Sequence, residues 1–141
     1  MNPMDLEILL ILAGVGQLVL CLASLAIPGQ LGWRKQLEAV RPLTRQVFWT
    51  YALYILGTNM AMGLLTILGV GELLNGTLLA KAVCGFAAAW WGGRVLIQFV
   101  YFDRSDTPPG RKYALAEISL VALFVFLAGT YTAALCVNFT Q

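Results

Sequence analysis

Among the charged residues inside otherwise apolar runs of this sequence, Arg94 and Glu117 could do chemistry. Arg94 lies in the run Trp-Trp-Gly-Gly-Arg-Val-Leu-Ile-Gln that begins at Trp90, and Glu117 lies four residues after Tyr113. A charge among apolar side chains is costly unless it has a partner. We therefore expect an ion pair between Arg94 and Glu117 that fixes the register of two helices. The alternative is a site where Arg94 binds an anionic headgroup, a substrate or an ion.

A second candidate is the acidic pair in Asp-Arg-Ser-Asp, formed by Asp103 and Asp106. Paired aspartates can hold Mg²⁺ that is bridged to a phosphate, as chemistry on lipid phosphates requires. The simpler interpretation is an ordinary loop, because aspartate and serine are common in turns and Arg104 neutralises part of the charge. Two stretches match the pattern of a glycosylation acceptor, which matters only in a eukaryotic source: Asn75-Gly-Thr77 and Asn138-Phe-Thr140.

The sequence lacks the residues that several kinds of chemistry require. The chain contains no histidine, so histidine-ligated haem, zinc and iron sites and a histidine general base are excluded. Its three cysteines, at positions 21, 84 and 136, are widely separated and form no metal-binding pair. We expect buried free thiols, with a disulfide between Cys84 and Cys136 as the alternative. We expect no resident metal or cofactor and favour a protein that is not an enzyme.

The composition defines the class. Sixty per cent of the 141 residues are hydrophobic and 11% are charged, whereas a soluble domain carries about 25% charged residues. The charges divide the chain into four apolar runs, each long enough to cross the roughly 30 Å hydrocarbon core as a helix. The sequence predicts a single all-α membrane domain, an antiparallel up-and-down bundle of four helices. Its spans cover about residues 6–27, 47–68, 78–102 and 113–137.

The basic residues predict the orientation. They gather in the two connections after the first and third spans, whereas the other ends are mainly acidic. The positive-inside rule places both basic connections in the cytoplasm and both termini outside. The net charge of +2 is therefore a topology signal, and we expect no nucleic-acid partner. A cleaved first segment is the alternative, but the acidic Asp5 and Glu7 are unlike the basic start of a signal peptide.

The first connection combines helix breakers with an amphipathic stretch. Pro28 and Gly29 should end the first span, and residues 33–40 should form a short helix on the membrane surface, stopped by Pro42. Basic side chains here could bind anionic lipid or simply set the topology. These are Arg34, Lys35, Arg41 and Arg45.

Polar residues within the spans should turn towards one another, because hydrocarbon offers them no hydrogen bonds. Small residues at four-residue spacing, such as Gly57 and Ala61, should pack helices within the monomer or form a dimer face. Trp90 and Trp91 should be packing residues beside glycines, with a wall for a flat ligand as the alternative. The predicted polar interior consists of Gln17, Thr58, Asn59, Gln98 and Tyr101.

Three motifs resemble those of uncharacterised small four-span inner-membrane proteins of bacteria: Leu31-Gly-Trp33, Arg41-Pro-Leu-Thr-Arg45, and Arg94 through Asp103. The resemblance implies a bacterial inner membrane and brings no catalytic residues. We expect an interaction, assembly or accessory subunit, as a homo-oligomer or with a membrane-protein partner. One alternative is an oligomeric transporter or channel protomer with a polar interior around Arg94. The other is an enzyme acting on lipid phosphate with Asp103, Asp106 and Arg94.

Overall fold

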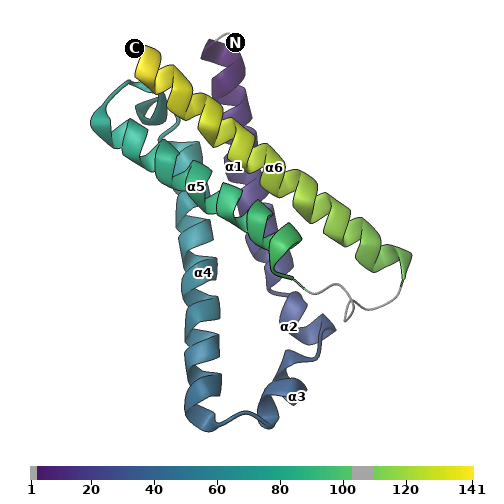
Figure 1. Cartoon of the computed structure of the whole chain (residues 1–141). Coiled ribbons are helices and arrows are strands. Elements are labelled where there is room, and N and C mark those ends of the chain that lie inside the picture. The colour runs from purple at the N-terminus through teal and green to yellow at the C-terminus, as the bar shows by residue number, and fades with distance from the viewer. Residues whose placement is uncertain (1–2, 103–109) are drawn as a thin grey trace. The chain divides into compact units, whose positions relative to one another are not determined.

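The computed structural model describes residues 3–102 and 110–141, and the regular elements of this part are all helical (Figure 1). This confirms the all-α class with four long helices. The shorter elements lie in two of the connections between consecutive long helices. The long helices are α1 (Pro3–Ser24), α4 (Pro42–Leu68), α5 (Leu78–Val100) and α6 (Arg111–Thr140). The short ones are α2 (Ile27–Gln30), α3 (Trp33–Glu38) and the 3-10 helix η1 (Glu72–Leu74).

Four stretches of the described chain are long and apolar enough to cross a membrane. The shortest, α5 with 23 residues, is about 34 Å long at 1.5 Å per residue, which exceeds the hydrocarbon core. By helix length and hydropathy this is a multi-pass membrane protein. The stretches are Met4–Gln30, Pro42–Leu68, Leu78–Val100 and Arg111–Thr140.

The helices form two compact units. One combines the start of α1, up to Ala13, with η1, α5 and α6, and the other runs from Gly14 to Leu68. Each unit has buried apolar side chains of its own, such as Leu127 in the first and Met62 in the second. The predicted single domain, with its up-and-down order and both termini outside, stays a prediction.

In the first unit, α5 and α6 lie side by side (Figure 1). Trp91 of α5 stacks on Phe124 of α6, with ring centroids 5.6 Å apart and planes 21° apart. Only 1% of the Trp91 surface is exposed, so it is a packing residue. A side chain at Gly85 would lie 3.8 Å from Leu135, so this glycine faces α6 within the monomer. Large apolar surfaces stabilise this helix pair.

In the second unit, α1 and α4 approach closely at two glycines. A methyl group on Gly14 would lie 2.6 Å from Ile67 Cγ1 and 2.9 Å from the carbonyl oxygen of Gly63. The backbone oxygen cannot move aside as a side chain can, so this approach requires glycine. Farther along, the Cys21 thiol donates to the carbonyl of Leu56 at 3.8 Å.

The break after the first span differs from the prediction. Helix α1 ends at Ser24, and Pro28 lies inside α2 instead of ending the span. A proline ring clashes with the carbonyl four residues earlier, which here belongs to Ser24, so the break precedes the proline. Likewise Pro42 starts α4, because a proline at the first position of a helix loses no hydrogen bond. The short helix predicted over residues 33–40 is present as α3, and its place on the membrane surface stays a prediction.

Candidate functional site

The two charges within the apolar runs are connected through an amide. Arg94 Nη1 donates to Oε1 of Gln98 at 3.4 Å, and Nε2 of Gln98 donates to Oε1 of Glu117 at 3.3 Å. All three side chains are half-buried. These contacts therefore run from α5 to α6 through Gln98, whereas the sequence predicts a direct ion pair. We call Arg94, Gln98 and Glu117 the polar relay.

Aromatic rings hold the arginine from two sides. The guanidinium carbon of Arg94 lies 4.9 Å from the ring centroid of Phe124 and 5.0 Å from that of Phe102. Ring faces carry negative potential, and each such contact contributes about 0.5–2 kcal/mol. Phe124 also stacks on Trp91, so the cation belongs to one contiguous aromatic cluster. The protein itself therefore surrounds much of this charge.

Helical spacing explains how the relay forms. In α5, Trp91, Arg94 and Gln98 follow one another at three and four residues, so they share one face. In α6, Glu117 and Phe124 are seven residues apart, which is two turns on one face. Packing these faces brings the opposite charges together. A cation linked through an amide to a carboxylate on the neighbouring helix is suited to holding helix register.

A second polar site is formed by Asn138, which the sequence pattern marks as a glycosylation acceptor. Asn138 of α6 is fully buried. Its Nδ2 donates to the carbonyls of Leu73 at 2.7 Å and Ala134 at 2.9 Å, and its Oδ1 accepts from Gly76 N at 2.8 Å. The Cys84 thiol also donates to the Leu73 carbonyl, at 3.6 Å. One amide thus ties η1 and the turn after it to α6.

The buried amide corrects the interpretation of Asn138 as a glycosylation acceptor, since a glycan nitrogen must be accessible. A different signal points to this role. The buried positions of α6 follow helical spacing, and Asn138 continues them one turn after Ala134. They are Phe124, Leu127, Thr130, Tyr131, Ala134 and Asn138.

The remaining residues of the predicted polar interior fall in different surroundings. Gln17 of α1 is fully buried, and Thr58 and Asn59 of α4 are half-buried, all three in the second unit. Tyr101 is 80% exposed and follows the last residue of α5, so it lies on the surface instead of in the interior. A tyrosine just beyond a span is typical of the membrane interface. A shared interior built by all these residues stays a prediction.

The remaining residues that were predicted to do chemistry are the acidic pair and the cysteine thiols. Asp103 and Asp106 lie outside the described residues. Within residues 3–102 and 110–141, no group of three or more metal-ligating side chains comes together. Cys21 and Cys84 are free and buried, whereas Cys136 is free and exposed, which corrects the expectation that all three are buried.

The four apolar helices thus define the class, a small multi-pass membrane protein in which a glutamine and two aromatic rings contact the arginine at position 94. The comparisons with known proteins add no narrower family. No family model matches the chain, and no curated protein or solved structure matches it.

Proposed function

We propose that this protein is an accessory or assembly subunit of a larger complex in the bacterial inner membrane, with both termini outside. The distribution of basic residues supports the orientation, since it favours cytoplasmic placement of both basic connections. Anionic lipid would meet the first of these connections. Its basic residues are Arg34, Lys35, Arg41 and Arg45.

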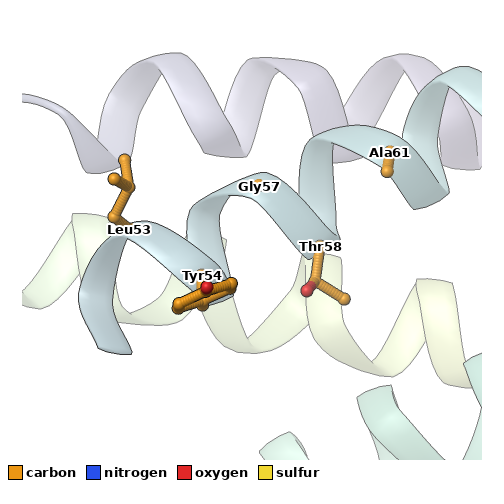
Figure 2. Close-up of a pocket in the computed structure, with 5 residues that line it drawn as sticks. All are labelled: Leu53, Tyr54, Gly57, Thr58 and Ala61. Atoms are coloured by element: carbon orange, nitrogen blue, oxygen red, sulfur yellow. The ribbon is translucent and has the colours of Figure 1, made fainter. Parts of the chain in front are cut away.

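The observation that carries the proposal is a groove on α4. Five residues at helical spacing line a hollow of about 330 Å³, which we call the α4 groove (Figure 2). Its floor is made of small residues, and a side chain at Gly57 would meet nothing within 4 Å. Small residues four apart let another helix approach closely in a membrane. The lining residues are Leu53, Tyr54, Gly57, Thr58 and Ala61.

Two hydroxyl groups make lipid a poor occupant of the α4 groove. Tyr54 and Thr58 lie one turn apart on the same helix, and Tyr54 is 71% exposed (Figure 2). In the span predicted over residues 47–68, Tyr54 is seven residues, or about 10 Å, from the inner end and therefore inside the hydrocarbon core. Tyrosine favours the membrane interface, because hydrocarbon cannot satisfy its hydroxyl. A partner helix with a polar group could satisfy both hydroxyls.

Site-specific photocrosslinking tests the proposal. A photoreactive residue at Ala61 should give one discrete product in native membranes, corresponding to this 15.3 kDa chain joined to a different protein. Gly57→Leu should abolish that product by filling the groove. It should leave the stability of the isolated protein unchanged or higher, because nothing contacts that position and leucine favours helix over glycine.

The matched control carries the same photoreactive residue at Ile55, which is 52% exposed and lies on another face of α4. It should give no such product. A product of two copies of this chain, or equal crosslinking from Ile55 and Ala61, would contradict the proposed heteromeric contact through the groove.

A further inference from the structure

A charged hollow lies in the second unit, between α3 and the start of α4. It has a volume of about 450 Å³ and is lined by Arg34, Glu38, Arg45 and Trp49. Sites for small molecules measure roughly 300–1,000 Å³, so the hollow is large enough for a polar headgroup. We call it the headgroup hollow, and its four residues carry two positive charges and one negative charge.

Aromatic packing holds the two helices that form this hollow. The ring of Trp33 in α3 meets Phe48 of α4 edge to face at 5.4 Å and lies 6.4 Å from Trp49. Phe48 and Trp49 are themselves 5.5 Å apart. Such pairs prefer defined geometries, so the cluster fixes the short helix α3 against α4. The residue after Trp33 is Arg34, which the cluster therefore positions.

Each helix contributes one pair of lining residues at the same spacing. Arg34 and Glu38 are four apart in α3, and Arg45 and Trp49 are four apart in α4, so each pair lies on one face of its helix. Across the described part of the chain, neither arginine forms a salt bridge or a side-chain hydrogen bond. Their donors are therefore available to a ligand.

The charges indicate the chemistry of that ligand. Two guanidinium groups around one hollow suit a phosphate, because each can form paired hydrogen bonds with its oxygens. A site for a simple anion would exclude carboxylates, yet Glu38 lines the same hollow. A carboxylate beside a phosphate site favours a ligand that also carries a positive charge. Tryptophan at the edge of a span is typical of the headgroup region, and its face attracts an ammonium.

We propose that the headgroup hollow binds an aminophospholipid, with its phosphate on Arg34 and Arg45 and its ammonium beside Glu38 and Trp49. This goes beyond general attraction of anionic lipid to the basic connection, since it makes a zwitterionic headgroup the preferred ligand. Its place at the cytoplasmic surface rests on the orientation proposed above. Binding itself is measured on the isolated protein, so a failure of partner docking on α4 leaves this test unaffected.

Native mass spectrometry of the full chain in detergent micelles tests the site, with phosphatidylethanolamine and phosphatidylglycerol added separately. The wild-type protein should retain phosphatidylethanolamine more tightly. Arg45→Gln should weaken that binding about tenfold, as expected for losing a charged hydrogen-bonding partner. Glu38→Gln should reverse the preference towards phosphatidylglycerol, because the amide no longer attracts an ammonium or repels an anion.

The control is Lys35→Gln, which removes the same charge from α3 at a residue that does not line the hollow. It should leave the binding of phosphatidylethanolamine within about twofold, a change well below that of a lost charged hydrogen bond. Circular dichroism checks that each variant keeps its helices, and Arg34→Gln repeats the phosphate test at an exposed position. A wild-type preference for phosphatidylglycerol, or an equal loss in Lys35→Gln, would overturn the proposal. Equally tight binding of inorganic phosphate would overturn it too, by assigning the hollow to a soluble anion.

Discussion

Replacing Asn138 by leucine should lower the free energy of unfolding by about 2–4 kcal/mol, because it removes the partners of buried backbone groups. The side-chain amide is fully buried and bonds the Leu73 carbonyl and the Gly76 amide, both distant in sequence. Leucine has a similar volume but satisfies neither group. Unfolding in mixed detergent micelles, followed by circular dichroism, measures the change.

Two further variants show whether the amide itself is responsible. Thr140→Ala removes an exposed hydroxyl near the same helix end, which bonds only Val137 of the same helix, and should cost less than about 0.5 kcal/mol. Asn138→Asp keeps the acceptor for Gly76 but loses the donor to Leu73, so it should destabilise as well. If Asn138→Leu were as stable as Thr140→Ala, the amide would not hold η1.

The second large effect is expected in the polar relay, where the coupling between Arg94 and Glu117 should depend on Gln98. Each single change to leucine removes one end of the relay and leaves Gln98 with a single charged neighbour, so the double variant should be more stable than the two separate losses predict. The coupling should be about 1 kcal/mol, which is typical of polar contacts between membrane helices. Unfolding of all four proteins of the cycle in micelles gives this number.

Repeating the same cycle in a Gln98→Leu background separates a relay from a direct ion pair. With the connecting amide removed, the coupling between positions 94 and 117 should fall to near zero. Arg94→Lys is the matched variant for the aromatic contacts, since it keeps the charge but loses the flat group between Phe102 and Phe124. Full coupling without Gln98 would support the direct ion pair predicted from the sequence.

Helix type and number follow from the sequence because apolar runs of this length have few alternatives in lipid. The sequence also predicts that α5 packs against the face of α6 that carries Glu117, because Arg94 and Glu117 each need a partner of opposite charge. The glycines beside Trp90 and Trp91 likewise predict packing residues, and Trp91 stacks on Phe124.

The finer geometry depends on packing that periodicity does not specify. Gln98 was expected in a general polar interior, but its position between two charges follows from how α5 rotates against α6. Asn138 stands in the pattern of a glycosylation acceptor. Its burial follows from the contact of η1 with the end of α6, which that pattern does not indicate. Tyr101 has helical spacing with Arg94, yet α5 ends one residue before it and leaves it exposed. The end of helix α5 thus decides where Tyr101 lies, whereas its helical spacing alone predicts the interior.

The claim on which the account depends is that these helices cross a membrane with the basic connections inside. Single cysteines in a chain with Cys21, Cys84 and Cys136 replaced by alanine measure this by reaction with a membrane-impermeant maleimide in spheroplasts. Two positions report the predicted outer side, Glu72→Cys and Gln141→Cys, and two report the inner side, Lys35→Cys and Thr44→Cys. All four are exposed. We predict labelling of the outer pair in intact spheroplasts and of the inner pair only after permeabilisation, whereas labelling of the inner pair in intact spheroplasts would contradict the account.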